Sequence, residues 1–346
     1  MLGITPPRNV IYYSSNANPI PLAGIANLPY TDVIIAFLVP DNNLNLVGAG
    51  GAFDDNLQSN IRTLQNAGKN VLISFGGAIF PSAAYQSYAR NVNGLVNQIV
   101  NNFVTRYGFN GVDIDFEDDA GFTGTYDGIG FLSNLTSGLY QVLPSGRNII
   151  THAPQTPYWN PNYDNAPYTQ IWRRVGNQIA WINNQFYDNP DYDRDAATKV
   201  LWYRNVAAIT GAQKLLVGAL VANTGTDEGY ITLDDMIQNV IRPLQSNFGS
   251  QFGGVMGWEF ALDQGGAWAK GIGEALGGSP GGCPGQSYTV VAGDTLYAIA
   301  QRFLGNGNLW VDLTKPDGTH FTPAEAENLQ IGQVVCIPGQ STGEAL

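Results

Sequence analysis

Eight short runs of apolar and β-branched residues recur over about 250 residues of this chain, and segments with helical periodicity separate most of them. The runs cover residues 10–13, 33–39, 71–75, 112–116, 149–152, 179–186, 215–220 and 254–258. Apolar residues three and four positions apart indicate helices at residues 56–67 and 129–143. Eight strands that alternate with helices predict an α/β fold, the parallel (β/α)8 TIM barrel. The strand count and the lack of a Gly-x-Gly-x-x-Gly turn argue against a doubly wound open sheet, which is the alternative.

The fourth run carries the most informative pattern in the chain. Asp113, Asp115 and Glu117 alternate there with three large apolar residues, and successive side chains of a strand point to opposite faces. Three carboxyl groups therefore share one face at intervals of roughly 7 Å, where their repulsion pushes their pKa values apart. Acid–base chemistry requires such an arrangement, whereas a fold does not. A solvated acidic edge strand is the alternative, but the apolar opposite face argues against it.

Catalytic groups of a TIM barrel lie at the C-terminal ends of its strands. Glu117 stands where the fourth strand would end. Other strand ends carry Tyr13, Gly76, Gly77, Gln155, Gln185, Tyr187 and Trp258. We expect these residues to converge on one face of the barrel and to form the functional site there.

Charge limits the partners that the chain can bind. Charged residues make up only 13% of the chain, below the usual ~25%, and the net charge is −12. Binding to nucleic acid or to anionic membrane requires clustered Lys and Arg, so neither is an expected partner. No apolar run reaches the ~18 residues of a membrane span. We expect a monomer whose polar surface suits neutral carbohydrate.

The N-terminal residues contain no apolar core of a secretion signal. We expect a secreted protein whose signal has been removed, or one that is exported by another route. His152 and His320 are the only histidines, and neither has Cys, His or a carboxylate at metal-ligand spacing, so we expect no metal and no cofactor. A cation beside Asp118 and Asp119 is less favoured than a solvated loop.

The composition changes at residues 277–286, which read Gly-Gly-Ser-Pro-Gly-Gly-Cys-Pro-Gly-Gln. This stretch predicts a flexible linker between a large catalytic domain, residues 1–276, and a small module, residues 287–338. The pattern of the module predicts the order β-α-α-β. Residues 339–346 are expected to form a disordered tail.

Two features define the small module. Thr322, Pro323 and Glu325 have the order of an N-cap, a first-turn proline and a capping box at the start of its second helix. Cys283 and Cys336 are the only cysteines and bracket the module, whose small core would gain from a covalent link. We expect a disulfide between them, and two free thiols are the alternative.

Several of these motifs resemble those of family 18 glycoside hydrolases over about residues 1–276. Residues 110–117 resemble the signature Asp-x-x-Asp-x-Asp-x-Glu, with Asn110 in place of the first Asp. Residues 74–77 resemble the Ser-x-Gly-Gly motif, and residues 184–187 resemble the Gln-x-Tyr of the plant-type, hevamine-like branch. Further similarity covers Tyr12 and residues 35–37, 153–155 and 254–258.

The chain departs from the family pattern in two places. Asn110 lies three residues before Asp113, so alternation places it on the opposite strand face, where we expect it to support the strand. Ser14-Ser15 follows the first strand where the hevamine-like pattern has Gly-Gln, which alters the expected substrate contacts. The resemblance also implies cis peptide bonds at Ala36–Phe37 and Trp258–Glu259.

The family resemblance implies retaining hydrolysis in which the 2-acetamido group of the substrate replaces an enzyme nucleophile. Glu117 would be the general acid, Asp115 would accept the acetamido N–H, and Asp113 would share a proton with Asp115. Tyr187 would donate to the acetamido oxygen, and Trp258 would form an apolar floor. The residues expected to bind substrate are Gln185, Trp258, Tyr12, Gln155, Ser74, Gly76 and Gly77.

The C-terminal module resembles a LysM domain in residues 288–296 and 331–338. LysM domains bind polymers that contain N-acetylglucosamine. The likeness implies ligand contacts from two loops, the second of which, residues 315–318, departs from the common Asn-Pro pattern. The loop residues concerned are Gly293, Asp294, Thr295, Leu296, Pro316 and Asp317.

These resemblances predict an endo-acting retaining chitinase that cleaves β-1,4 linkages between N-acetylglucosamine units and is targeted to chitin by its LysM domain. An endo-β-N-acetylglucosaminidase that acts on N-glycan cores is the first alternative, because the same catalytic row serves that reaction. A non-catalytic chitin-binding lectin is the second, although such relatives usually lose the catalytic Glu, and peptidoglycan cleavage is the third. The only glycosylation sequon begins at Asn134, on a predicted helix.

Overall fold

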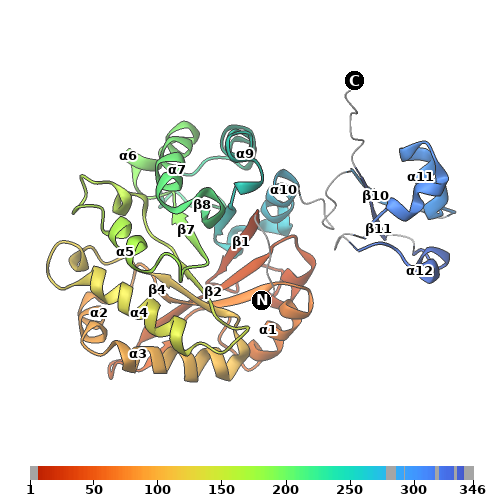
Figure 1. Ribbon diagram of the computed structural model, residues 1–346. Helices are drawn as coiled ribbons and strands as arrows, with labels where there is room; N and C mark the ends of the chain where they lie inside the picture. Colours follow the sequence, from red (N-terminus) through yellow and green to blue (C-terminus); the bar gives the residue numbers. More distant parts are fainter. Residues whose placement is uncertain (1–6, 278–285, 292, 316–318, 331–332, 339–346) are drawn as a thin grey trace. The chain divides into compact units, whose positions relative to one another are not determined.

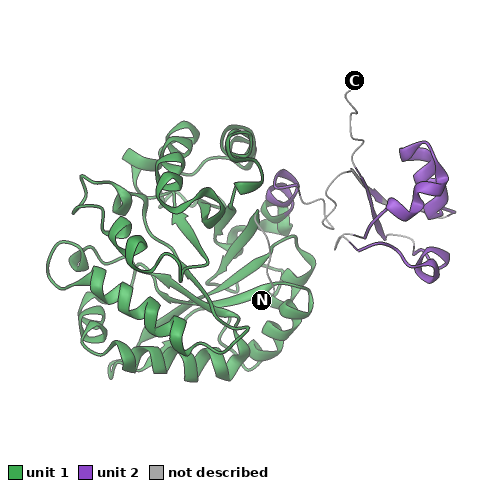
Figure 2. Cartoon of the chain, viewed as in Figure 1, with its two compact units in different colours: residues 1–269 green, residues 270–346 purple. Residues whose placement is uncertain are grey.

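The computed structural model describes residues 7–277, 286–291, 293–315, 319–330 and 333–338. The chain divides into two compact units, residues 1–269 and residues 270–346 (Figure 2). This division falls within helix α10 (Ala267–Ala275), whereas the sequence suggested a boundary after residue 276.

Eight parallel strands form a closed barrel in the first unit (Figure 1). Strand β1 pairs with both β2 and β9, so the barrel sheet has no free edge. The barrel strands are β1 (Arg8–Tyr13), β2 (Asp32–Pro40), β4 (Asn70–Gly76), β5 (Gly111–Asp115), β6 (Ile149–His152), β7 (Trp181–Gln185), β8 (Leu215–Leu220) and β9 (Gly254–Trp258). Strand β3 (Leu46–Gly48) pairs antiparallel with the end of β2. Each run of the sequence that predicted a strand lies on one of the eight, so the TIM barrel is confirmed.

Helices connect the strands and cover the outside of the barrel (Figure 1). They are α1 (Leu57–Asn66), α2 (Ser82–Ala89), α3 (Val92–Ile99), α4 (Gly128–Val142), α5 (Pro167–Val175), α6 (Pro190–Asp193), α7 (Ala196–Thr210), α8 (Leu233–Asp235), α9 (Arg242–Phe248) and α10. The wider π-type helices η2 (Val100–Gly108) and η6 (Met236–Ile241) continue α3 and α8. The side chains of Asn91, Asp127 and Asp195 cap α3, α4 and α7, because each accepts a backbone N–H of the first turn.

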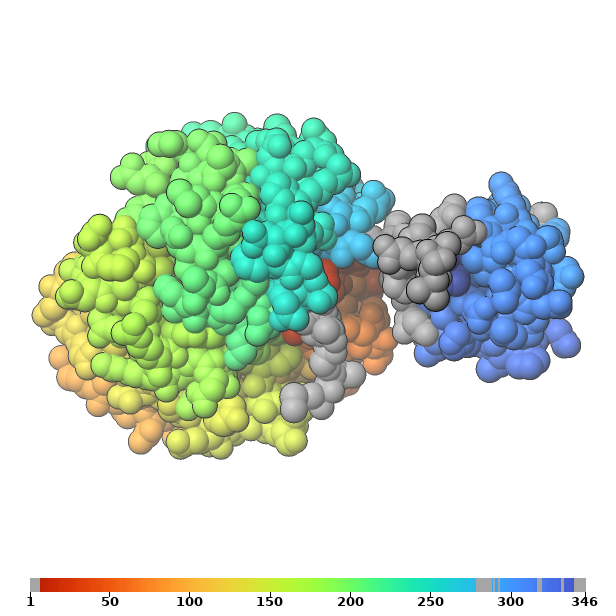
Figure 3. Space-filling model, turned by 45° about the horizontal axis from the view of Figure 1, so that its top comes forward, coloured from red at the N-terminus to blue at the C-terminus, as the bar shows by residue number. Residues whose placement is uncertain are grey.

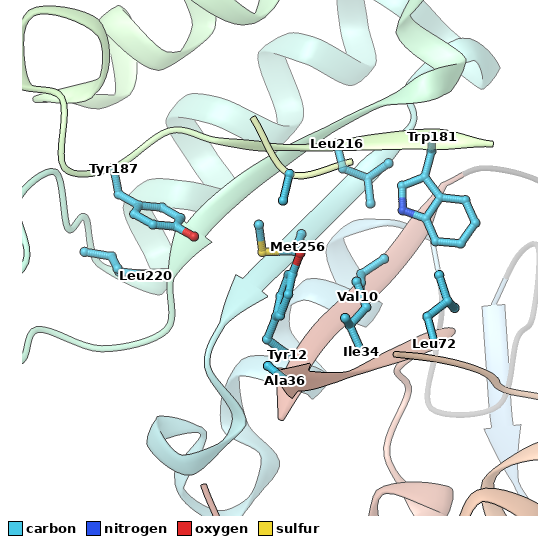
Figure 4. Packing of buried hydrophobic residues seen from close by; sticks show 11 residues of the cluster. Val10, Tyr12, Ile34, Ala36, Leu72, Trp181, Tyr187, Leu216, Leu220 and Met256 are labelled. Atoms are coloured by element: carbon cyan, nitrogen blue, oxygen red, sulfur yellow. The ribbon is translucent and has the colours of Figure 1, made fainter. Parts of the chain in front are cut away.

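A cluster of buried apolar side chains fills the barrel interior (Figure 4). Its members are Val10, Tyr12, Ile34, Ala36, Leu72, Ala153, Trp181, Tyr187, Leu216, Leu220 and Met256. Trp181 lies at one end of this cluster and Tyr187 at the other. The Arg8 guanidinium lies 4.0 Å from the Trp181 ring centroid and forms a 3.2 Å ion pair with Asp32. These contacts fill the barrel interior at the N-terminal ends of the strands. The functional cavity lies instead at the strand ends.

The second unit contains the predicted β-α-α-β order. Strand β10 (Gln286–Thr289) pairs antiparallel with β11 (Val334–Ile337), and α11 (Leu296–Leu304), η10 (Gly307–Asp312) and α12 (Pro323–Glu327) lie between them in the chain. Thr322 and Glu325 form the predicted capping box at the start of α12. The small core consists of Val290, Leu296, Ile299, Ala300, Leu313, Phe321, Val335 and Ile337. Across both units, none of the helices in the described residues has the length and apolar character needed to cross a membrane.

Candidate active site

A cavity of about 460 Å³ lies at the C-terminal ends of the barrel strands. Predicted site residues that line it are Tyr12, Asp115, Glu117, Gln155, Gln185, Tyr187 and Trp258. They come from β1, β5, β6, β7 and β9 and from the residues that follow these strands. Parallel strands thus bring together side chains that are far apart in the sequence, as a barrel of this topology requires.

Asp113 lies on β5 behind the cavity wall and is fully buried. Its Oδ2 accepts hydrogen bonds from the hydroxyls of Tyr12 and Ser74, both at 2.7 Å. Its Oδ1 accepts from the Thr151 hydroxyl at 2.6 Å and from the Asn183 amide at 3.2 Å. Burial raises the pKa of Asp113, and the donors oppose this rise because they stabilise the charged form. Donors therefore engage both carboxylate oxygens and offset part of the effect of burial.

Asp115 and Glu117 hydrogen-bond each other at the cavity, and Gln185 Nε2 donates to Asp115 Oδ1 at 2.9 Å. Burial, followed by the charges of Glu117 and Asp113, raises the pKa of Asp115 well above its usual range. Burial also raises the pKa of Glu117, although hydrogen bonds from Gln185 and Asp115 oppose the rise. Two carboxyl groups share a hydrogen bond only when one of them is protonated, so one proton serves Asp115 and Glu117. The resemblance implied a proton shared by Asp113 and Asp115, whereas both Asp113 oxygens are bonded to other donors here.

Two glutamines hold the side chain of Glu117. Gln185 Nε2 lies 3.5 Å from Glu117 Oε1, and Gln155 Nε2 lies 3.5 Å from Oε2. An isolated bridge pairs Gln155 with Gln185 at the ends of β6 and β7, so the two amides are presented side by side. This contact fixes the orientation of the most accessible carboxyl group of the row.

Aromatic rings form one side of the cavity. The Trp258 ring centroid lies 5.6 Å from that of Tyr12 and 5.8 Å from that of Phe37. The peptide bonds Ala36–Phe37 and Trp258–Glu259 are both cis, as the resemblance implied. Burial raises the pKa of Tyr187 well above its usual range, so its hydroxyl is a neutral hydrogen-bond donor toward the cavity.

Two acidic residues of the cavity wall, Asp188 and Asp227, were not expected from the sequence. Asp188 has a left-handed φ of 60°, and its Oδ1 accepts the backbone N–H of Glu228 at 2.7 Å. The only sequence signal for Asp188 is its place directly after Tyr187 in the Gln-x-Tyr motif. Asp227 comes from the loop after β8, where no local pattern marks it.

Ser14 connects two strand ends at the cavity wall. Its backbone N–H donates to Glu259 Oε2 at 2.9 Å, and its hydroxyl donates to the same oxygen. Glu259 follows β9, so this contact joins the end of β1 to the end of β9. Ser14, which departs from the hevamine-like pattern, therefore has a hydrogen-bond partner within the chain, the carboxylate of Glu259.

Three residues that we expected to bind substrate lie behind the cavity wall. Ser74 is fully buried, and its hydroxyl donates to Asp113. Gly76 and Gly77 have φ values of 120° and 90°, and a Cβ on Gly76 would lie 1.9 Å from the carbonyl oxygen of Asp115. Because β4 approaches β5 so closely here, these residues support the carboxyl row and do not line the cavity.

Asn110 supports the strand, as its position opposite the carboxyl row predicted. Its Oδ1 accepts the Val71 backbone N–H at 2.8 Å and the Gln65 side-chain amide at 2.9 Å. The residue is buried. It therefore ties the start of β5 to β4 and α1.

Tyrosine hydroxyls donate hydrogen bonds to Asp118 and Asp119, the acidic pair that follows Glu117. Asp118 accepts from Tyr126 at 2.8 Å, and Asp119 accepts from Tyr158 at 3.0 Å and from Tyr163 at 2.6 Å. These bonds link the loops after β5 and β6. Within the described ranges, no group of three or more His, Cys, Asp and Glu side chains is placed to hold a metal ion.

The first predicted loop of the small unit is ordered by its own residues. Asp294 Oδ2 accepts from the Tyr288 hydroxyl at 2.8 Å, and the Thr295 side chain caps α11. Gly293 has a φ of 90°, which suits glycine. Leu296, which we expected to contact a ligand, is instead buried in the core of the unit.

Three predicted positions, Pro316, Asp317 and Cys283, lie outside the described residues. The second loop and the disulfide therefore stay predictions. Cys336 is buried on β11. Asn134, where the sequon begins, is exposed on α4.

Comparison with known proteins agrees with this geometry. The sequence model of glycosyl hydrolases family 18 matches residues 8–227. The chain belongs to this family. A LysM domain model matches residues 288–315, so the protein is a family 18 glycoside hydrolase with a C-terminal LysM domain.

Relatives of this family 18 enzyme include plant, bacterial and fungal proteins. The acidic endochitinase of Nicotiana tabacum is 31% identical over 276 residues, which cover 74% of this chain and 88% of that protein. The structure of a family 18 chitinase from Pseudoalteromonas aurantia is 36% identical with a TM-score of 0.74, and the match covers 78% of this chain and all of that one. A fungal endo-β-N-acetylglucosaminidase, at 22% identity and a TM-score of 0.61, shares the fold over 78% of this chain and 98% of its own.

Proposed function

We propose that the barrel is an endo-acting, retaining chitinase that cleaves β-1,4 linkages between N-acetylglucosamine units with the help of the substrate's acetamido group. The observation that carries this proposal is the row of carboxyl groups on and just after β5. It presents one partly accessible acid, Glu117, beside a buried carboxyl group, Asp115, that shares its proton. A cavity of about 460 Å³ in front of this row offers room for sugar units.

Glu117 supplies the proton for the leaving group. Burial raises the pKa of Glu117, which favours the protonated form that a general acid must have. The glutamine amides of Gln155 and Gln185 hold the carboxyl group in place. When the sugar is bound, the proton of the pair lies on Glu117 and Asp115 is the carboxylate. Glu117 then donates this proton to the glycosidic oxygen as the bond from that oxygen to the anomeric carbon breaks.

The acetamido oxygen of the same sugar forms the new bond to the anomeric carbon. This step gives a cyclic oxazolinium ion, whose positive charge is shared by the acetamido nitrogen. Asp115 accepts the N–H of that group and stabilises the charge, while Asp113 remains beneath it as a carboxylate held by its donors. Tyr187 donates its hydroxyl to the acetamido oxygen and aligns it for attack.

Water completes the reaction. It attacks the anomeric carbon from the face that the leaving group vacated, gives a proton to Glu117, and breaks the bond to the acetamido oxygen. Two inversions at one carbon leave the product with the β configuration. The enzyme returns to its starting state with Glu117 protonated.

The LysM domain supports chitin as the polymer. A second binding unit on the same chain raises the effective concentration of an insoluble substrate near the barrel. The name of the tobacco relative, an acidic endochitinase, supports internal cleavage. We further propose, from the sequence alone, a secreted monomer with a disulfide between Cys283 and Cys336 and with no nucleic-acid or membrane partner.

Digestion of a chitin hexamer by the wild type and by Glu117→Gln tests the catalytic proposal. We expect the wild type to give dimer, trimer and tetramer, and we expect kcat to fall about 10²–10⁴-fold in the variant, because the amide cannot donate the proton. Glu274→Gln on α10, outside the cavity, is the matched control and should keep the activity. A wild type that leaves the hexamer intact but releases glycans from a high-mannose glycoprotein would contradict the chitinase assignment.

A further inference from the structure

A second cavity, of about 590 Å³, lies on the outer side of the barrel unit. Its wall is formed by the loop before α5, by α5 itself and by α7. In Figure 3 the yellow-green surface of the α5 region adjoins the green surface of the α7 region. The apolar lining residues are Trp159, Pro161, Ala166, Trp202, Val206, Ala208 and Ile209.

Four polar groups of this wall have no hydrogen-bond partner among the described residues. Thr169 Oγ1 is buried and makes no hydrogen bond. Within the described part of the chain, the side chains of Asn165, Arg173 and Asn205 also make none, although all three line the cavity and are exposed. An apolar pocket with a few unengaged polar groups around it has the general build of a small-molecule site.

Trp202 is the flat apolar element of the site. Its ring packs against Tyr192 with centroids 4.7 Å apart, and the Tyr192 hydroxyl accepts a hydrogen bond from Asn160 at 2.9 Å. The indole is therefore held in place before any ligand arrives. A fixed indole that borders a cavity can stack on the C–H face of a sugar ring.

The rim of the cavity has an uncommon backbone. Asp164, Asn165 and Ala166 have consecutive φ values of 43°, 58° and 53°, in the left-handed region that residues other than glycine rarely adopt. Runs of this kind are found where the surrounding structure holds a loop for binding. Here the run places Asn165 and Ala166 on the cavity wall.

The charge of the cavity indicates the kind of ligand. Its lining contains one Arg and no carboxylate, in a protein whose net charge is −12. The cavity at the strand ends is different, because Asp115, Glu117, Asp188 and Asp227 all line it. Amides, a guanidinium and an indole without acids match a neutral ligand rich in hydroxyl and amide-carbonyl acceptors.

We propose that this second cavity binds an N-acetylglucosamine oligomer apart from the catalytic cavity. Trp202 stacks on one sugar ring, and Asn165, Asn205 and Arg173 hydrogen-bond its hydroxyl and acetamido groups. The inference rests on the proposed chitinase function, since it takes the same polymer as the ligand. Such a site adds a third contact to the polymer besides the active site and the LysM domain, and it increases retention on an insoluble chain.

Binding of the full-length chain to insoluble chitin tests the site. All proteins carry Glu117→Gln so that the polymer is not consumed, and Trp202→Ala is compared with Tyr140→Ala, which removes an aromatic ring on α4 that is 51% exposed. We expect Trp202→Ala to raise the dissociation constant about two- to tenfold and Tyr140→Ala to leave it unchanged. Equal binding by the two variants would overturn the proposal.

Two further measurements keep the outcome interpretable. Asn205→Asp adds a charge at an exposed position of the wall without removing packing, and we expect it to weaken binding even if Trp202→Ala folds poorly. In the chain with Glu117 intact, Trp202→Ala should cleave the soluble hexamer at the wild-type rate. A wild type that does not cleave the hexamer would refute the catalytic proposal. If the wild type cleaves the hexamer but Trp202→Ala binds chitin as tightly as its parent, only the second site is refuted.

Discussion

The three carboxyl groups on and just after β5 have different surroundings, and burial raises the pKa of each of them. The alternation in residues 112–117 predicted that Asp113, Asp115 and Glu117 share a face. In the structure Asp115 and Glu117 line the cavity, and Asp113 lies buried behind its wall. The alternation pattern could not predict the donors to Asp113. These donors come from β1, β4, β6 and β7 and meet only when the barrel closes. For the same reason the sequence suggested that Ser74 binds substrate, whereas its hydroxyl donates to the Asp113 carboxylate.

Ser74→Ala removes one donor to a buried carboxylate, so we expect a loss of about 1–3 kcal/mol in the free energy of unfolding. The Ser74 hydroxyl lowers the pKa of Asp113, so its loss raises that pKa and moves the acid limb of the kcat profile to higher pH. Ser133→Ala is the control, since among the described residues the Ser133 hydroxyl bonds only the Ile129 carbonyl of α4. An unchanged pH profile in Ser74→Ala would contradict this role.

At the scale of elements, periodicity predicted what is long and regular. The eight barrel strands and helices α1 and α4 follow from apolar spacing, as does the β-α-α-β order of the small unit. The three residues of β3 are too few to give a pattern, and β3 forms because the end of β2 offers it a partner. Asp227 and the second cavity depend on loops and on helix packing, which no local spacing encodes.

His152 joins three elements, because its ring nitrogens on β6 contact Thr136 of α4 at 3.0 Å and Tyr168 of α5 at 3.3 Å. Burial lowers the pKa of His152 to about 3. In the unfolded chain this histidine takes up a proton near pH 6.5, whereas in the folded chain it stays neutral until about pH 3. The folded state therefore loses stability as the pH falls from about 6.5 toward 3.

We expect the stability deficit of His152→Asn relative to wild type to shrink by about 3 kcal/mol between pH 7 and pH 4, as measured by urea unfolding of the barrel. His320→Asn, at an exposed histidine of the second unit, should show no such change. A deficit that is the same at both pH values would mean that His152 does not resist protonation in the folded state.

At the scale of the whole molecule, a catalytic barrel and a small LysM domain are joined in one chain with few charged residues. The change in composition at residues 277–286 predicted this organisation. The barrel has its own closed sheet and its own core, so it contains every residue of the proposed reaction. We therefore expect the LysM domain to affect how the polymer is held and to leave the bond-breaking steps unchanged.

A chain that ends at Gly277 should therefore cleave the soluble hexamer at the rate of the full chain. On insoluble chitin we expect its initial rate at low substrate to be roughly ten- to a hundredfold lower, because the effective concentration supplied by the second unit is lost. Circular dichroism of the shortened chain serves as the folding control. Equal rates on insoluble chitin would show that the LysM domain does not target this polymer.

The anomeric configuration of the first products tests the central claim most directly. Proton NMR of the hexamer digest, recorded before the new reducing ends equilibrate, distinguishes the two anomers. Attack by the acetamido oxygen followed by water predicts β products. Initial α products would mean direct attack by water with inversion, and would contradict the proposed roles of Asp115 and Glu117.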